Sequence, residues 1–152
     1  MGPNVMRAAV VLSVICWAAA IAQANVMWLG QPYSVSIPTH INGINQVITS
    51  SSNLTLHHDV ACDILVSVAV AGNEVLTTGG RTLTTAYKLT GADVSNADGA
   101  WVPSATFITK TYHVVGTGPN STITIAVQAT PPSNRAADAG AYSASITLTA
   151  TW

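Results

Sequence analysis

Charged side chains are scarce in this chain: Asp, Glu, Lys and Arg make up 7% of its 152 residues, against about 25% in typical soluble domains. Five Lys and Arg stand against six Asp and Glu, so the formal net charge at pH 7 is −1. Binding to nucleic acid or to an anionic membrane surface needs a basic patch, and this balance argues against either partner. So few charges also give little protection against self-association, which a protein that sits in an assembly can tolerate.

The N-terminus has the three parts of a secretory signal peptide. Arg7 is the only charge before an apolar run, Ala8 to Ile21, and the small-residue pattern Ala22-Gln23-Ala24 follows this run. The run is shorter than the ~20 residues that a membrane-spanning helix needs. We therefore expect residues 1–24 to be a signal peptide and the protein to be exported, with no stable membrane span after processing. An uncleaved membrane anchor is the alternative.

Cysteine is also rare, and its scarcity excludes a disulfide framework. Removal of residues 1–24 would also remove Cys16, which leaves Cys62 as the only cysteine and makes an intramolecular disulfide impossible. The neighbours of Cys62 include Ala61, Ile64 and Leu65, which predict an apolar strand. Burial of Cys62 as a small hydrophobic residue is the favoured interpretation. Pairing with a cysteine of another chain is the alternative.

No segment after residue 24 has the spacing of a good amphipathic helix; apolar and polar residues alternate instead. The clearest alternation ends the chain, over residues 142–152, where Ser and Thr occupy every second position. Period-two alternation of this length predicts a half-buried antiparallel strand with Thr on its outer face. The apolar face of this strand comprises Tyr142, Ala144, Ile146, Leu148, Ala150 and Trp152.

Other short segments also read as strands separated by turns. The expected strands cover residues 33–37, 53–57, 64–71, 82–89, 105–115 and 121–128. Gly79-Gly80 is expected to be a hairpin turn, and Ser50-Ser51-Ser52 another turn. About seven short strands with turn clusters between them predict an all-β sandwich or barrel, with one domain over residues 38–152.

The C-terminal residues resemble those of a known family. Asp138-Ala139-Gly140-Ala141-Tyr142, followed by the alternating strand, is similar to the ending of bacterial chaperone–usher fimbrial (pilin) subunits and of spore-coat-type exported subunits. The resemblance implies an immunoglobulin-like β-sandwich that lacks one strand. It also implies that a periplasmic chaperone first fills the groove, that an outer-membrane usher assists, and that the next subunit then donates a strand. The paired cysteines of many classical fimbrial subunits are missing here.

The matching N-terminal extension would be residues 25–37, immediately after the signal peptide. Gly30 and Pro32 interrupt its alternation, which departs from the family pattern. A segment that is simply the first strand of its own domain is the alternative. The candidate donor residues are Val26, Trp28, Tyr33, Val35 and Ile37.

These features predict a structural subunit of an extracellular filament or surface coat, joined to identical or related subunits by strand addition. The C-terminal strand would line the acceptor groove. The alternative function is a self-contained secreted module that binds a carbohydrate or protein ligand, with Trp101 in its loop as the candidate contact.

The sequence gives little support for a catalytic or metal-binding site. His57-His58-Asp59, with Cys62 and Asp63, is the only cluster that resembles a metal site. Consecutive residues of a strand point to opposite faces, so His57 and His58 could not hold one ion without a bend. The chain has no G-x-S-x-G elbow and no phosphate-binding loop. We therefore expect no enzyme activity, no metal and no cofactor.

Overall fold

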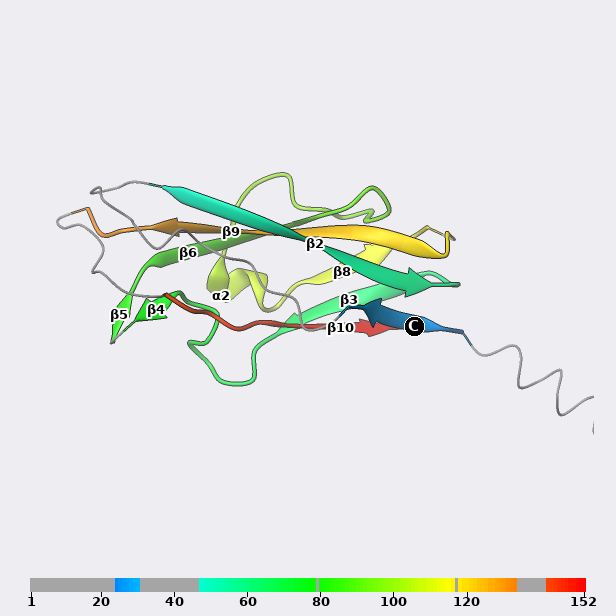
Figure 1. Ribbon diagram of the computed structural model, residues 1–152, viewed down its shortest axis with the longest axis horizontal. Coiled ribbons are helices and arrows are strands. Elements are labelled where there is room, and N and C mark those ends of the chain that lie inside the picture. Colours follow the sequence, from blue (N-terminus) through cyan, green and yellow to red (C-terminus); the bar gives the residue numbers. More distant parts are fainter. Residues whose placement is uncertain (1–23, 31–46, 79, 117, 134–141) are drawn as a thin grey trace, which may run out of the picture.

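Two antiparallel sheets lie one above the other and enclose the hydrophobic core (Figure 1). The computed structural model describes residues 24–30, 47–78, 80–116, 118–133 and 142–152. The predicted all-β class is confirmed, with strands forming most of the secondary structure in these residues. The candidate donor residues Tyr33, Val35 and Ile37, and the residues expected to form the signal peptide up to position 23, lie outside them.

The larger sheet has the order β1-β2-β9-β6-β7 and the smaller sheet the order β10-β3-β8, with every neighbouring pair antiparallel. A separate two-stranded hairpin, β4–β5, occupies the position where Gly79-Gly80 predicted a turn. The strands are β1 (Val26–Leu29), β2 (Ile48–His58), β3 (Cys62–Ser67), β4 (Thr77–Thr78), β5 (Arg81–Thr82), β6 (Thr84–Thr90), β7 (Val102–Pro103), β8 (Thr111–Val114), β9 (Asn120–Thr130) and β10 (Thr147–Thr151).

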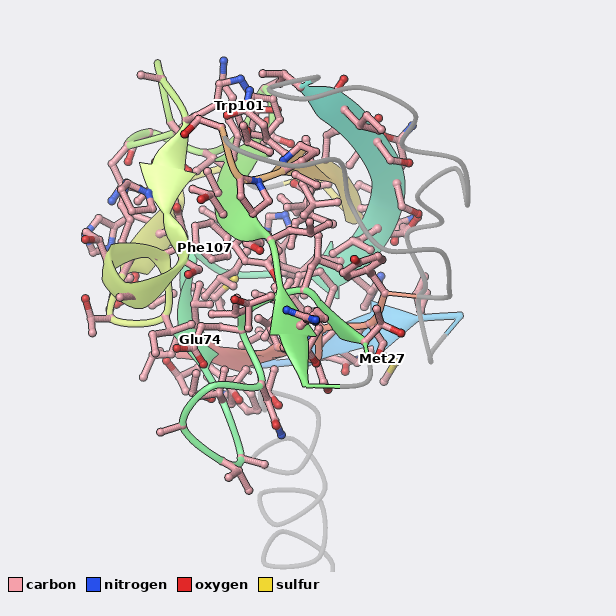
Figure 2. The ribbon with its side chains drawn as sticks, turned by 90° about the vertical axis from the view of Figure 1, so that its left-hand side faces the viewer. Met27, Glu74, Trp101 and Phe107 are labelled. Carbon is pink, nitrogen blue, oxygen red and sulfur yellow. The ribbon has the colours of Figure 1, made fainter. Side chains whose placement is uncertain are left out.

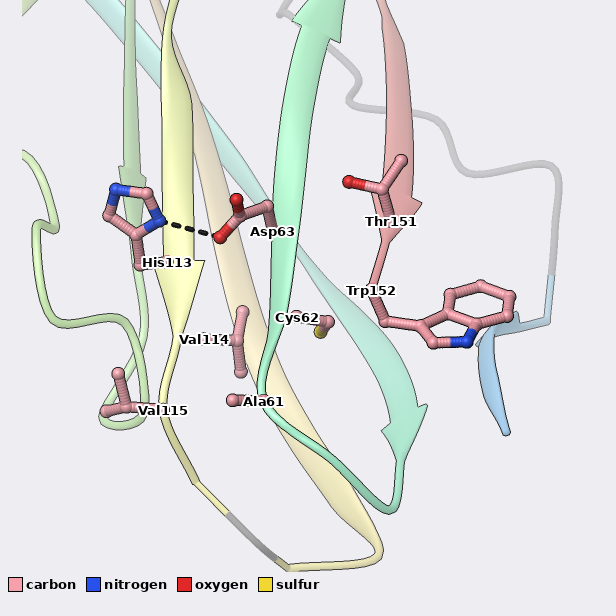
Figure 3. Close-up of a pocket in the computed structure, with 8 residues that line it drawn as sticks. All are labelled: Ala61, Cys62, Asp63, His113, Val114, Val115, Thr151 and Trp152. Carbon is pink, nitrogen blue, oxygen red and sulfur yellow. Dashed lines mark hydrogen bonds and ion pairs between the residues drawn. The ribbon is translucent and has the colours of Figure 1, made fainter. Parts of the chain in front are cut away.

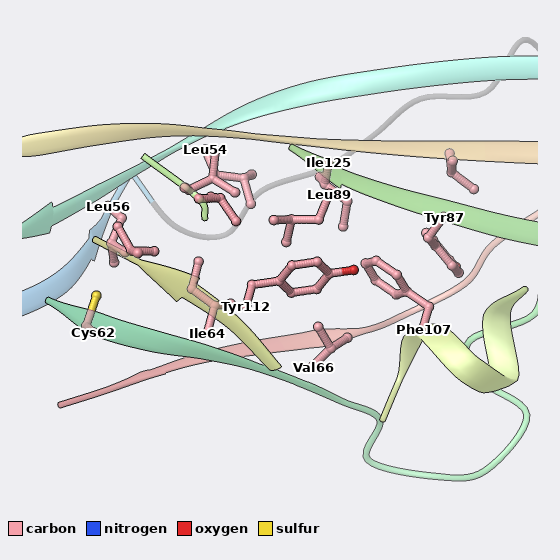
Figure 4. Close-up of a cluster of buried hydrophobic side chains, with 14 of the residues drawn as sticks. Leu54, Leu56, Cys62, Ile64, Val66, Tyr87, Leu89, Phe107, Tyr112 and Ile125 are labelled. Carbon is pink, nitrogen blue, oxygen red and sulfur yellow. The ribbon is translucent and has the colours of Figure 1, made fainter. Parts of the chain in front are cut away.

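Alternation along the central strands builds the core. On β9, Ile123, Ile125 and Val127 are buried while the residues between them face outward. The same period places apolar side chains of β2 and β6 on the inner face of the larger sheet, opposite those of β3 and β8 (Figure 4). Side chains from both sheets therefore form one continuous hydrophobic cluster.

The segment expected to be one strand over residues 105–115 is instead a helical turn followed by a strand. Helix α2 (Ser104–Phe107) comes first, and β8 begins at Thr111. A continuous strand would point Phe107 and Tyr112 to opposite faces, because their numbers differ by an odd count. The helical turn changes this phase, so both rings are fully buried, and Phe107 stacks on Tyr87 with ring centroids 4.9 Å apart. No helix in the described ranges is long and apolar enough to cross a membrane.

Two further expectations about strand limits were wrong. Ser50, Ser51 and Ser52 lie inside β2, paired with Val127, Ala126 and Ile125 of β9, and do not form a turn. The long β9 offers partners along its whole length, and this pairing outweighs the weak turn preference of serine. The C-terminal strand β10 is also shorter than expected, because its partner β3 ends at Ser67. Upstream of β10, Ser143 pairs with Thr77 instead.

Candidate assembly edge

The two edges of the smaller sheet differ. The β8 edge is covered by the loop after β6: the Val115 N–H donates to the Asp93 carbonyl at 2.9 Å, and the Ser95 N–H donates to the His113 carbonyl at 2.9 Å. At the opposite edge, β10 pairs with β3 on one side only, and no other described strand pairs with it. Within the described residues, the open edge of the smaller sheet is therefore the C-terminal strand β10.

Nothing in the composition of β10 protects this edge. Its residues, Thr147 to Thr151, are Thr, Leu, Thr, Ala and Thr, without a charge or a proline. Edge strands of soluble proteins are usually guarded by lysine, proline or a bulge, because an unpaired strand edge can pair with another chain. By this criterion, β10 is suited to accept a further strand.

The inward side chains of β10, and that of Ile146 just before it, are less buried than those of the neighbouring strand β3. Ile146, Leu148 and Ala150 pack against the core but stay partly exposed, whereas Ile64 on β3 is fully buried. Of the other residues expected on this face, Tyr142 is partly buried, Ala144 is exposed and Trp152 is 68% exposed. The hydrophobic layer is thus incompletely covered along the C-terminal strand.

The edge of the larger sheet on this side is β1, which contacts β10. In Figure 1 the two strands lie beside each other near the C-terminus. Val26 and Trp28 turn their side chains inward, against the same core that Leu148 and Ala150 contact. The Nε1 atom of Trp28 is buried and has no hydrogen-bond partner among the residues that the structure describes. A buried donor without an acceptor is uncommon in native proteins.

The structure assigns the first candidate donor residues to their own domain. Val26 pairs with His58, and Trp28 pairs with Leu56, both on β2. The turn after β2 holds the start of β1, since the Asn25 N–H donates to Asp59 Oδ1 at 2.8 Å. A donor role for Val26 and Trp28 would require β1 to leave β2.

Trp101 lies elsewhere. It is half-buried immediately before β7, and Figure 2 places it well apart from Met27 of β1. The structure therefore does not bring Trp101 together with the β1 and β10 residues.

A shallow pocket of about 430 Å³ lies at the end of β10 (Figure 3). Cys62, Asp63, His113 and Trp152 are among its lining residues. His113 Nδ1 contacts Asp63 Oδ1 at 2.6 Å, with both side chains about half exposed. The Asp63 carboxylate is therefore paired with the imidazole ring of His113.

Cys62 is a free, buried cysteine, as the burial interpretation expected. Burial, and to a smaller extent the negative charge of Asp63, raises the pKa of the Cys62 thiol. A thiol held in its protonated form is a poor nucleophile and a poor metal ligand. Across the described part of the chain, no three His, Cys, Asp or Glu side chains are grouped so that they could hold a metal ion.

Two polar clusters were not anticipated from the sequence. In the first, Ser121 Oγ lies 2.7 Å from His58 Nε2 and 2.5 Å from Asp93 Oδ2. Serine lies between the other two residues, which differs from the order of a hydrolytic triad. Ser121 is also 1% exposed, so a substrate cannot reach it.

The second cluster surrounds Asp98. Its carboxylate accepts hydrogen bonds from the Leu89 N–H at 2.8 Å, from the Tyr112 hydroxyl at 2.6 Å and from Lys110. Burial, then the hydrogen bond to Asp98 and the charge of that carboxylate, raises the pKa of Tyr112. This cluster fixes the loop between β6 and β7 and ties it to β8. No sequence signal could have found either cluster, because their members are brought together only by the sheet topology.

Compared with known proteins, the chain matches no protein-family model, no curated protein and no solved structure. A proposal for its function therefore depends on the geometry of the open edge.

Proposed function

We propose that this protein is an exported structural subunit of an extracellular filament or surface coat, assembled by β-strand addition. The observation that carries the proposal is the open, uncharged edge of β10 above a partly exposed hydrophobic layer. An incoming strand would pair with β10 and place alternate side chains over Leu148 and Ala150.

The proposal includes an immunoglobulin-like sandwich that is completed by the neighbour's strand. In support, β1 and β10 are edge strands of different sheets and lie on the same side of the core. The buried indole N–H of Trp28 lies on this side and finds no acceptor within the described ranges. A backbone carbonyl of an added strand is one group that would satisfy it.

The donor is an identical or related subunit. Since Val26 and Trp28 are paired with β2, the donated strand comes from the part of residues 25–37 that follows β1. A periplasmic chaperone that occupies the β10 edge before assembly, and an outer-membrane usher, complete the proposed pathway.

A second candidate is the self-contained binding module with Trp101 as a ligand contact. The pairing of β1 within its own domain favours it, because the first strand then already has its partner.

One experiment separates the two candidates: electrophoresis of the purified protein in denaturing buffer, with and without boiling and with and without reductant. A ladder that boiling removes and reductant does not supports strand-exchanged polymers. A ladder removed by reductant alone identifies cross-links through Cys62 and contradicts strand addition. A single monomer band in every lane, with a monomeric native mass, favours the binding module.

A variant pair sharpens this test. Thr149→Lys places a charge on the open strand β10, where it should suppress pairing with another chain and abolish the ladder. Thr122→Lys places the same charge on the exposed face of β9, which is paired on both sides. A ladder lost equally in both variants would contradict the assignment of β10 as the assembly edge.

A further inference from the structure

The cluster of His58, Ser121 and Asp93 joins three segments of the chain. His58 ends β2 and is fully buried, and Ser121, the second residue of β9, is 1% exposed. Asp93 lies in the loop after β6 and is partly exposed. His58 Nδ1 is 3.0 Å from the Val60 carbonyl oxygen, and His58 Nε2 is 2.7 Å from Ser121 Oγ. The Ser121 hydroxyl lies 2.5 Å from Asp93 Oδ2.

The number of hydrogens available to these contacts decides how they are made. The Val60 carbonyl can only accept, so His58 Nδ1 must carry a hydrogen. A neutral imidazole then has a lone pair at Nε2, and the Ser121 hydroxyl has a single hydrogen for its two short contacts. If Asp93 is also ionised, both partners of the Ser121 hydroxyl are acceptors. The single hydrogen serves one of them, and at the other contact two lone pairs face each other with no hydrogen between them.

One additional proton removes this conflict. Placed on His58 Nε2, it donates to Ser121 Oγ, and Ser121 donates to Asp93. Placed on the Asp93 carboxyl group, it donates to Ser121, and Ser121 donates to His58 Nε2. In both forms all three contacts are satisfied and the cluster has no net charge, which is the arrangement that burial favours.

We propose that His58, Ser121 and Asp93 form a proton clasp, a cluster of two buried side chains and one partly buried carboxyl group that is complete only while it holds this additional proton. Release of the proton opens a contact of Ser121 and loosens the loop after β6. The effect reaches β8, because the Asp93 carbonyl accepts the Val115 N–H and Val94 bridges to Val114. The clasp makes this end of the domain sensitive to pH, whether or not the protein assembles by strand addition.

The other titratable groups near the clasp have partners of their own or are exposed, apart from the free thiol of Cys62, whose pKa is raised by burial. On β2, His57 contacts Asn120 Oδ1 at 3.1 Å, and in the following turn Asp59 accepts the Asn25 N–H. On β3 and β8, Asp63 pairs with His113 on the outer face. Cys62 is buried on β3. The cation Lys110 binds Asp98.

The sign of the pH effect follows from proton counting. An ordinary histidine in the unfolded chain releases its proton near pH ~6.5, so above this pH the folded state binds one proton more. The unfolding equilibrium constant should therefore rise with pH, by up to about tenfold per pH unit, until the clasp releases its proton.

Denaturant unfolding of the purified protein between about pH 6.5 and about pH 8 tests this. Asp93→Asn supplies a hydrogen from its amide without taking up a proton, so this variant should lose the rise in the unfolding constant. Asp63→Asn makes the same change in the exposed contact with His113 and should keep the rise. If the unfolding equilibrium constant rises with pH as steeply in Asp93→Asn as in Asp63→Asn, the proposal is overturned.

If Asp93→Asn does not fold, nuclear magnetic resonance on the wild-type protein at about pH 7 decides. The clasp is supported if the chemical shifts of the ring nitrogens show a doubly protonated His58. It is equally supported if the chemical shift of the carboxyl carbon shows a protonated Asp93. A neutral His58 ring together with an ionised Asp93 carboxylate overturns it.

Discussion

The Tyr112 hydroxyl donates a hydrogen bond to Asp98 Oδ2 across 2.6 Å, and this contact ties β8 to the loop after β6. Tyr112 is fully buried and Asp98 is 7% exposed. Tyr112→Phe removes the hydroxyl but keeps the ring, so the lost contact is a hydrogen bond to a charged group. We expect a loss of about 1.5–3 kcal/mol in the free energy of unfolding, measured by urea denaturation.

Tyr142→Phe is the matched control, because Tyr142 is only partly buried and lies outside the Asp98 cluster. Its substitution should change the free energy of unfolding by less than ~0.5 kcal/mol. Equal losses in the two variants would contradict a special role for the Tyr112–Asp98 contact.

Alkaline pH should destabilise the fold through Tyr87. Its hydroxyl donates to the Glu74 carbonyl at 2.8 Å, and burial, followed by the charge of Glu74, raises its pKa to about 12. In the unfolded chain the phenol ionises near pH ~10. The stabilisation is therefore fully present below pH ~10 and is lost as pH rises toward ~12, by about 1.4 kcal/mol per pH unit.

Urea denaturation at about pH 9 and about pH 11 measures this loss, and the absorbance of tyrosinate follows the ionisation directly. Tyr87→Phe should lose less stability between these two pH values than the wild type. Tyr112, whose pKa is also raised, contributes with the same sign in both proteins. A Tyr87→Phe variant that loses as much as the wild type would contradict the assignment.

Much of the sheet structure could be predicted because alternation is a local property of the sequence. The alternation in β9 predicts a strand without any tertiary information, and the structure buries its three apolar residues, Ile123, Ile125 and Val127. The one-turn helix before β8 has no comparable local signal. It is explained only by the fit of Phe107 beside Tyr87, a contact between residues twenty positions apart in the chain.

The polar clusters could not be predicted for a related reason. His58 and Ser121 are 63 positions apart, and Asp93 is 28 positions from Ser121. Only the order of the strands brings them together. The open edge of β10 is an intermediate case, since its alternation is visible in the sequence but its place at the edge of a sheet depends on topology.

Gly91 lies where a side chain does not fit. A Cβ atom at this position would lie 2.9 Å from the Thr122 carbonyl oxygen and 3.0 Å from Val94 Cγ2. The carbonyl belongs to the central strand β9 and cannot move without disturbing the larger sheet. We expect Gly91→Ala to lower the free energy of unfolding by about 1–3 kcal/mol, measured by urea denaturation.

Gly99→Ala is the control, because a Cβ atom there would meet nothing within 4 Å. Its effect should stay within ~0.5 kcal/mol. A loss in Gly99→Ala as large as that in Gly91→Ala would attribute the effect to backbone freedom and would contradict the packing explanation.

Trp28→Phe tests whether an added strand satisfies the buried indole. The substitution removes the Nε1–H donor, which has no acceptor in the described part of the chain, and keeps an aromatic ring against the core. The monomer should lose little stability, because the lost contact area is offset by removal of an unsatisfied donor that costs about 1–3 kcal/mol. If the neighbour's strand supplies an acceptor, the polymer should dissociate at a lower temperature, since the variant lacks that hydrogen bond. Trp101→Phe, made outside the β1 and β10 edges, should leave the dissociation temperature unchanged, and equal shifts in the two variants would contradict a strand docked beside Trp28.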